Sequence, residues 1–182
     1  MKEAKKKKWK AQKELYLFYA DDMMSIAVRY TKDISAAKDL VQDTFMKFFE
    51  KIEQYDINKG KPGPWISRIL INRALQNIKK ESRLSFSDES VFEKELSNEQ
   101  SVVEKLEAED ILKLLQKLPE GCRAVFNLYV VEGYKHDEIG GMLGITAGAS
   151  RSQLSRAKQL LRKIIKKNKC NSDMKTEWVN QS

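Results

Sequence analysis

Apolar residues recur at steps of three or four positions along most of this chain, the spacing of one face of an α-helix. A long stretch of this kind begins at Asp33 or Ser35, either of which can cap a helix, and ends near Tyr55. Residues 15–30 show the same spacing and predict one or two helices packed against it. Because no alternating strand pattern of useful length occurs, we expect an all-α fold. The apolar positions of the long helix are Ala37, Val41, Phe45, Phe48 and Ile52.

Three prolines, at positions 62, 64 and 119, interrupt this pattern. Residues 55–64 combine two of them with two glycines and are expected to form a loop. Apolar spacing resumes at Trp65 and predicts a helix that reaches Lys80. A further helix is expected from residue 102, and Pro119 ends it.

Residues 82–101 are serine-rich, acidic and aperiodic, which predicts a linker that is flexible or becomes ordered on binding. We therefore expect two small helical domains, residues 1–81 and residues 102–166, joined by this flexible acidic linker. Residues 167–182 are expected to form a polar tail.

The second domain has the order of a helix-turn-helix module: a short helix, a glycine turn and a longer basic helix. Residues 119–131 predict a helix that precedes the module's second helix, residues 136–143, which Gly144 ends. Thr146 can cap the third helix, whose exposed side is expected to carry Arg151, Ser152, Ser155 and Arg156. Arginine can bind guanine through two hydrogen bonds, worth roughly 1–3 kcal/mol of discrimination. Many basic helix faces are merely solvated, however, so the module alone does not name a function.

Charge supports a polyanionic partner, either nucleic acid or an anionic membrane. The net charge is +8 and the pI is about 9.3. Residues 1–80 carry +8, residues 81–110 carry −7 and residues 111–182 carry +7. Two basic blocks therefore flank an acidic one.

Several classes of site find no support in the sequence. No apolar run approaches the ~20 residues of a membrane span, and the N-terminus has no signal core, so a cytoplasmic protein is expected. Cys122 and Cys170 have no partners at metal-ligand spacing and are expected to be free or buried thiols. The one histidine, His136, has no catalytic or metal-binding companion and is expected at a helix start. We expect no cofactor, no metal and no enzymatic activity.

Two blocks of sequence carry a family resemblance. The segments DLVQDTFMKFFEKIEQYD (39–56) and PWISRILINRALQNIKK (64–80) resemble region 2 of bacterial sigma-70-family factors. Residues 118–164, which include the helix-turn-helix, are similar to region 4 of that family, and no region 3 separates the two. This arrangement resembles the extracytoplasmic-function (ECF) subfamily over residues 12–166. It implies a dissociable subunit that directs core RNA polymerase to promoter DNA and helps to open the duplex.

The resemblance also implies partners and roles for particular residues. It implies contacts with the polymerase β′ clamp helices and the β subunit, and we expect a monomer; whether an anti-sigma factor binds stays open. The implied docking face comprises Asp39, Leu40, Gln42, Asp43 and Phe45. The residues implied at the minus 10 element are Trp65, Arg68, Asn72, Arg73, Asn77, Lys79 and Lys80. Those implied at the minus 35 element are Thr146, Arg151, Ser152, Ser155 and Arg156.

Chemistry suits these roles. An unpaired base needs hydrogen bonds to its Watson–Crick edge, which Asn72 can supply, and phosphates need arginine and lysine. Trp65 is either a core residue or a platform for a base. The acidic linker either imitates nucleic acid in a polymerase channel or is simply solvated.

Several positions depart from the family pattern. Pro62 stands in the loop where an aromatic residue is common, and Lys135 replaces a hydroxyl cap before the second helix of the module. Gly140 and Gly141 each cost about 1 kcal/mol of helix stability relative to alanine. Ala149 and Ser150 occupy positions where threonine and valine are usual.

Two other classes of function remain as alternatives. An autonomous helix-turn-helix regulator would normally dimerise, and this chain has no coiled-coil heptads. An RNA-binding or nucleic-acid-processing protein predicts aromatic stacking motifs or clustered acidic metal ligands, and neither pattern is found.

Overall fold

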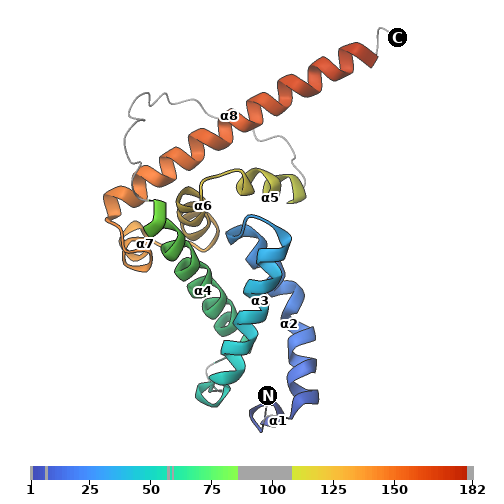
Figure 1. Cartoon of the computed structure of the whole chain (residues 1–182), viewed down its shortest axis with the longest axis vertical. Helices are drawn as coiled ribbons and strands as arrows, with labels where there is room; N and C mark the ends of the chain where they lie inside the picture. Colours follow the sequence, from blue (N-terminus) through green and yellow to red (C-terminus); the bar gives the residue numbers. More distant parts are fainter. Residues whose placement is uncertain (1, 7, 57, 59, 86–107, 180–182) are drawn as a thin grey trace. The chain divides into compact units, whose positions relative to one another are not determined.

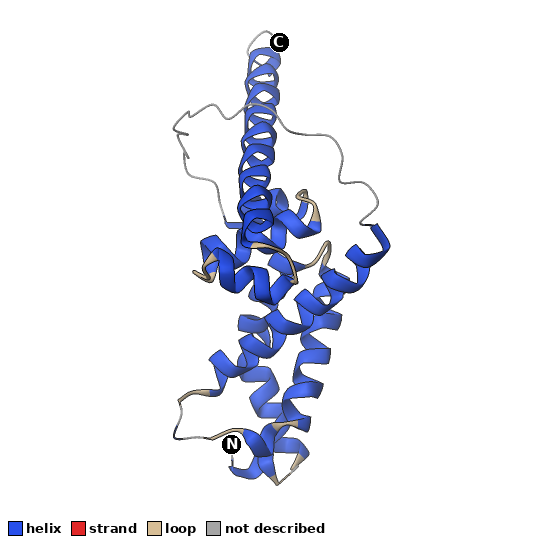
Figure 2. Cartoon of the chain, turned by 90° about the vertical axis from the view of Figure 1, so that its left-hand side faces the viewer, coloured by secondary structure: helices blue, strands red, loops and turns tan. Residues whose placement is uncertain are grey.

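The structure is a computed structural model, and it describes residues 2–6, 8–56, 58, 60–85 and 108–179. All regular structure in these residues is helical, which confirms the all-α prediction (Figures 1 and 2). The chain divides into two compact units, Met1–Leu84 (unit 1) and Ser85–Ser182 (unit 2). Most of the predicted linker and the start of the helix predicted from residue 102 lie outside the described residues.

Unit 1 is built on three long helices. They are α2 (Trp9–Tyr30), α3 (Ile34–Glu50) and α4 (Pro62–Ser85), preceded by the short α1 (Lys2–Lys5). Helices α2 and α3 pack together, and α4 meets α3 where Arg73 pairs with Asp43. Fully buried apolar side chains of this unit include Phe48 on α3 and Ile66 and Leu70 on α4. Helices α3 and α4 thus share one core.

Helix α3 begins as the sequence predicts and ends earlier. The Asp33 side chain accepts a hydrogen bond of 2.8 Å from the backbone N–H of Ala36 and caps the helix, whereas Ser35 lies inside it. The helix stops at Glu50, and the 3-10 turn η1 (Ile52–Gln54) follows. Because a 3-10 turn keeps a three-residue step, Ile52 still reaches the core although the α-helix has ended.

Helix α4 begins at Pro62, three residues before the predicted start at Trp65. The prediction was wrong because the first-turn N–H groups of a helix have no intrahelical partner, so proline is tolerated there. A Cβ atom on Gly63 would lie 3.1 Å from the Tyr19 ring, so glycine lets the first turn of α4 approach α2 closely. The same helix extends to Ser85, past the predicted domain limit at residue 81.

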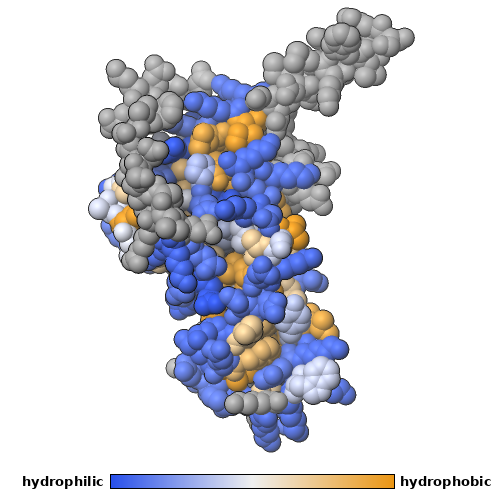
Figure 3. Space-filling view, viewed as in Figure 1, coloured by the Kyte–Doolittle hydropathy of each residue, from blue (hydrophilic) through white to orange (hydrophobic). Residues whose placement is uncertain are grey.

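Unit 2 contains the predicted helix-turn-helix. Its helices are α5 (Ala108–Gln116), α6 (Glu120–Phe126), α7 (His136–Leu143) and α8 (Ala147–Val179), and a π-helical turn, η3 (Asn127–Val131), follows α6. On the face drawn in Figure 3, hydrophobic residues appear as patches among hydrophilic ones. The apolar cluster that joins α5, α6 and α8 consists of Leu115, Leu118, Cys122 and Ala157, with Phe126, Leu160 and Leu161 packed against it.

Cysteine and arginine side chains contribute to the interior of unit 2. Cys122 is a buried free thiol, as expected, and its Sγ lies 2.9 Å from Gln153 Oε1. Burial raises the pKa of the Cys122 thiol, and the positive charge of Arg156 opposes this only in part. Arg123 is fully buried, which its charge did not predict, and donates a 3.3 Å hydrogen bond to the Gln116 carbonyl.

The two ends of α7 are shaped by local geometry. Lys135 provides no hydroxyl cap, but the Glu138 carboxylate accepts a 2.7 Å hydrogen bond from the Lys135 backbone N–H, which is half of a capping box. Gly144 has a φ of +74° and ends the helix. A Cβ atom on Gly140 would lie 2.8 Å from the Ile145 carbonyl oxygen, whereas one on Gly141 would meet nothing within 4 Å.

A polar contact that the sequence did not predict joins α7 to α8. His136 lies at the first position of α7, and its Nδ1 is 2.9 Å from the hydroxyl of Ser150, which is fully buried on α8. The His136 ring also stacks on Tyr129, with 4.5 Å between ring centres. The unusual serine at position 150 therefore has a partner.

Helix α8 begins with the predicted cap, because the Thr146 hydroxyl accepts a 3.0 Å hydrogen bond from the Ala149 N–H. It continues to Val179, so the segment expected to be a polar tail after residue 166 is largely helical.

The neighbouring glycines of α7 should respond oppositely to alanine. Gly141→Ala should stabilise unit 2 by about 0.5–1 kcal/mol because it lowers the entropy lost on folding. Gly140→Ala should destabilise it by about 1–3 kcal/mol because the new methyl group meets the Ile145 carbonyl. Urea denaturation followed by amide NMR signals of unit 2 measures both changes. A stabilising Gly140→Ala would contradict the close packing seen here.

The pair His136 and Ser150 should be coupled. Ser150→Ala and His136→Phe should each cost about 1 kcal/mol, since each leaves one partner of the hydrogen bond without the other. The double variant should cost less than the sum of the two, which a double-mutant cycle on the same denaturation signals reveals. Additive costs would show that the contact contributes nothing.

Candidate nucleic-acid interface

Helix α3 presents a polar face. Asp39, Gln42 and Asp43 are exposed, as the predicted docking face requires. Leu40 and Phe45, however, are only 4% and 3% exposed and belong to the core of unit 1. Two residues of the implied docking face are therefore not available at the surface, because unit 1 needs them for its own core. They support the polar face from beneath.

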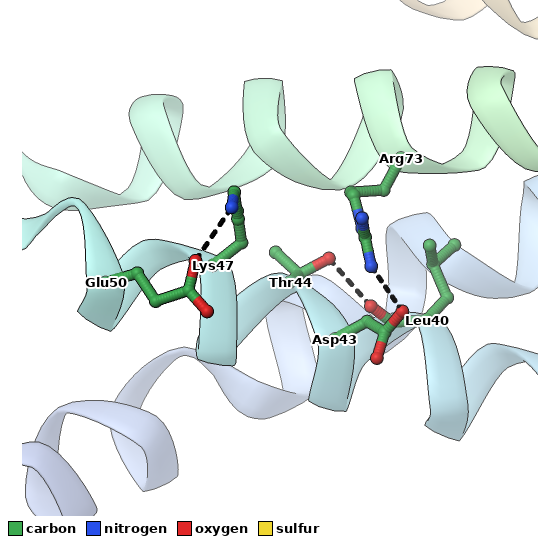
Figure 4. Close-up of polar contacts among 6 residues, drawn as sticks. All are labelled: Leu40, Asp43, Thr44, Lys47, Glu50 and Arg73. Carbon is green, nitrogen blue, oxygen red and sulfur yellow. Dashed lines mark hydrogen bonds and ion pairs between the residues drawn. The ribbon is translucent and has the colours of Figure 1, made fainter.

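Polar contacts link this face of α3 to α4 (Figure 4). Arg73 Nη2 on α4 lies 2.5 Å from Asp43 Oδ2 on α3, and both side chains are partly exposed. Along α3, Lys47 Nζ lies 2.7 Å from Glu50 Oε2, and the Lys47 hydrogen bond lowers the pKa of the Glu50 carboxyl. The buried Thr44 hydroxyl donates a 2.7 Å hydrogen bond to the Leu40 carbonyl within the helix.

Trp65 lies at the start of α4 inside an aromatic cluster. Its ring stacks on Tyr55, with 5.5 Å between centres, and meets Phe48 edge-on at 5.2 Å. Tyr55 is itself held by a hydrogen bond from its hydroxyl to the Gly60 carbonyl. Trp65 is half-buried, so its packing role is evident and part of its surface stays accessible.

The residues predicted to meet the minus 10 element divide between two sides of α4. Arg68 and Asn72 are exposed and one helical turn apart, and Lys79 lies two turns beyond Asn72 on the same side. Asn77 is exposed but lies about 140° around the helix from Asn72. Arg73 points towards α3, where it pairs with Asp43. Lys80 is exposed at the edge of the face that carries Asn72.

Helix α8 presents the predicted basic face. Leu154 and Ala157 are buried, while Arg151, Ser152 and Arg156 are exposed and Ser155 is half-buried. Gly140 lets the turn after α7 lie close to that helix, and Thr146 caps the N-terminus of α8. The N-terminal half of α8 is thereby held with its arginines outward, which is the arrangement a recognition helix needs in a major groove.

Two kinds of feature are absent from the described residues. No group of three or more His, Cys, Asp or Glu among them could hold a metal ion. None of the helices in the described ranges is long and apolar enough to cross a membrane.

Comparison with protein families matches both units in order. Residues 15–84 match Sigma-70 region 2, and residues 108–161 match Sigma-70 region 4.

Curated relatives and solved structures agree with these matches. The ECF RNA polymerase sigma factor SigM of Bacillus subtilis is 28% identical over 153 residues, 83% of this chain and 93% of SigM. SigE of Mycolicibacterium smegmatis is 29% identical over 85% of this chain and 61% of its own length. SigW of B. subtilis is 25% identical over 91% of this chain and 95% of its own length. The sigma factor RpoE of Bartonella quintana, solved in complex with the anti-sigma factor NepR, shares the fold with a TM-score of 0.52 and 24% identity, over 85% of this chain and 96% of that one. With region 2 and region 4 matched in sequence on two separate helical units, the chain belongs to the sigma-70 family of RNA polymerase sigma factors, in the ECF subfamily.

Proposed function

We propose that this sigma factor directs core RNA polymerase to promoters through one docking face and two DNA-reading faces. The observation that carries the proposal is that each matched unit exposes a face of basic and polar side chains suited to DNA. On α4 this face holds Arg68 and Asn72, and on α8 it holds Arg151 and Arg156.

The α4 face suits single-stranded DNA at the minus 10 element. Asn72 offers both a donor and an acceptor for the edge of an unpaired base, and Arg68 and Lys79 offer charge to its phosphates. Trp65, fixed by Tyr55 and Phe48, supports the start of this helix and offers only part of its ring to a base. Lys80 lies at the edge of the face, Asn77 lies about 140° around the helix from Asn72, and Arg73 is paired with Asp43. We therefore assign these three residues phosphate or supporting contacts.

The α8 face suits duplex DNA at the minus 35 element. Arg151 and Arg156 can reach base edges or phosphates, and Ser152 and Ser155 can donate to phosphate oxygens. The capped N-terminus of α8, at Thr146, adds backbone N–H groups that favour an anion. In this proposal unit 2 binds the upstream duplex, and unit 1 binds the strand that is opened downstream.

The polymerase contact is proposed on α3. Asp39, Gln42 and Asp43 form its exposed polar rim, and Met46, also exposed, adds the apolar contact that buried Leu40 and Phe45 do not supply. The β′ clamp helices are the proposed partner of this face and the β subunit a second partner. A protein with these partners acts in the cytoplasm, as a non-enzymatic monomer that needs no cofactor.

An anti-sigma factor is a further proposed partner. The B. quintana sigma factor of the same fold was solved with one. The autonomous-regulator alternative is not favoured, because the chain carries region 2 as well as region 4.

Reconstitution with core RNA polymerase tests the docking face. The chain should co-purify with core and support initiation from genomic fragments. The double variant Asp39→Ala/Gln42→Ala should bind core roughly tenfold more weakly, because truncation of contact residues removes about 1 kcal/mol or more. Asp21→Ala, on the exposed side of α2, is the matched control and should bind normally in the same fluorescence titration. A chain that neither binds core nor initiates transcription would refute the proposal.

Two substitutions should separate opening from initial binding on a promoter mapped by that reconstitution. Asn72→Ala should slow permanganate-detected opening and leave initial duplex binding unchanged, because its partner base is unpaired only after opening. Arg151→Ala should weaken initial binding roughly tenfold by loss of a base or phosphate contact. Gln54→Ala, an exposed amide on η1 outside the α4 face, and Arg162→Ala, beyond the N-terminal half of α8, are controls of the same chemistry. Equal effects of Asn72→Ala and Arg151→Ala at both stages would contradict the division of roles.

A further inference from the structure

The first residues of the chain carry charge that the proposed function does not use. Residues 2–13 contain seven lysines and one glutamate. They precede residue 15, where the match to Sigma-70 region 2 begins. A net charge of +6 on so short a segment calls for a polyanionic partner.

This segment is attached to a defined place in unit 1. Ala4 of α1 is fully buried, and Lys5 Nζ donates a 2.6 Å hydrogen bond to the Tyr55 carbonyl and a 3.3 Å one to the Glu53 carbonyl. Helix α1 therefore packs against η1, near the turn that leads from α3 to α4 (Figure 1). Tyr55 in turn stacks on Trp65, the residue that begins the proposed minus 10 face.

Four other lysines of this segment, Lys6, Lys8, Lys10 and Lys13, face solvent. The side chains of Lys6 and Lys8 are 70% and 63% exposed, and both pair with the single Glu3 carboxylate. Lys10 and Lys13 on α2 are also exposed. One carboxylate neutralises at most one of these charges, so the surface stays strongly positive.

An exposed aromatic ring stands among these lysines. Trp9 is 71% exposed, and Lys13 Nζ lies 5.4 Å from its ring centre. Surfaces that bind single-stranded nucleic acid combine basic groups, which follow the phosphates, with aromatic rings on which bases stack. We call Lys6, Lys8, Trp9, Lys10 and Lys13 the N-terminal basic patch.

An anionic membrane also attracts lysines, but it needs a continuous apolar helix face. The chain neighbours of Trp9 are lysines on both sides, and the residues one turn further on are Gln12 and Lys13. The most exposed apolar side chains further along α2, Leu17 and Phe18, have acidic residues beside them on the same helix, at positions 14, 21 and 22. Those carboxylates would be repelled by anionic headgroups.

We propose that the N-terminal basic patch binds single-stranded DNA that continues from the strand held by α4. Its lysines contact the phosphates, and Trp9 stacks on an unpaired base. The inference rests on the proposed minus 10 role of α4, and α1 is attached at Tyr55, whose ring stacks on Trp65 at the start of α4.

The test uses the full chain assembled with core RNA polymerase. The probe is a forked promoter DNA in which the mapped minus 10 non-template strand is single-stranded, and anisotropy gives its affinity over a series of potassium chloride concentrations. Lys6→Gln/Lys8→Gln/Lys10→Gln should weaken binding by about tenfold and reduce the salt slope by about 2, since each phosphate contact on a single strand contributes about 0.7. The matched triple Lys→Arg variant should retain both affinity and slope.

Trp9→Ala provides an independent signature. It should weaken binding roughly tenfold and leave the salt slope unchanged, because stacking releases no counterions. Trp9→Phe should restore most of the affinity.

The failures are distinguishable. If the wild-type holoenzyme does not bind the forked DNA, the proposed minus 10 role is overturned, and this inference with it. Equal affinities and slopes for the wild type and the triple Gln variant overturn the inference alone. The inference is also overturned if the triple Gln variant binds core more weakly than the wild type does. A vesicle flotation assay with phosphatidylglycerol–phosphatidylcholine gives the last outcome: a variant that loses only vesicle binding overturns the inference too.

Discussion

The burial of the apolar face of α3 against α2 and α4 is the interaction on which unit 1 depends. Leu40, Val41, Phe45 and Phe48 lie on this face and are almost fully removed from water. Each such side chain contributes about 1.5–3 kcal/mol, so together they are comparable with the whole net stability of a small domain. The opposite face of α3 must then be polar, and that polar face is the surface left for a partner.

The same packing brings the docking and reading helices into contact. Arg73 on α4 meets Asp43 on α3 through an ion pair that is partly exposed. Pairs of this kind are worth about 0–1 kcal/mol, so this one orients two side chains without locking the helices. The aromatic cluster of Phe48, Tyr55 and Trp65 does more to hold the start of α4, because its three rings make two close contacts.

In unit 2 the recognition helix is positioned by small and polar groups as much as by its apolar stripe. Gly140 allows the backbone of the turn to approach α7, and Gly144 adopts the left-handed conformation that ends it. The hydrogen bond between His136 and Ser150 links α7 to the buried side of α8. Arg151 and Arg156 stay outward because Leu154 and Ala157 occupy the inner side.

Periodicity by itself determined that the chain is helical, that Asp33 can cap α3, that a helix-turn-helix follows Pro119, and which side of α8 is basic. These features depend on residues close in sequence, and a 3.6-residue period sorts them reliably. Tertiary structure alone decided that Leu40 and Phe45 belong to the core, that Arg73 turns to Asp43, that Arg123 is buried, and that His136 meets Ser150. Each of these depends on a neighbouring helix, and spacing along one helix says which side chains share a face, not what that face meets.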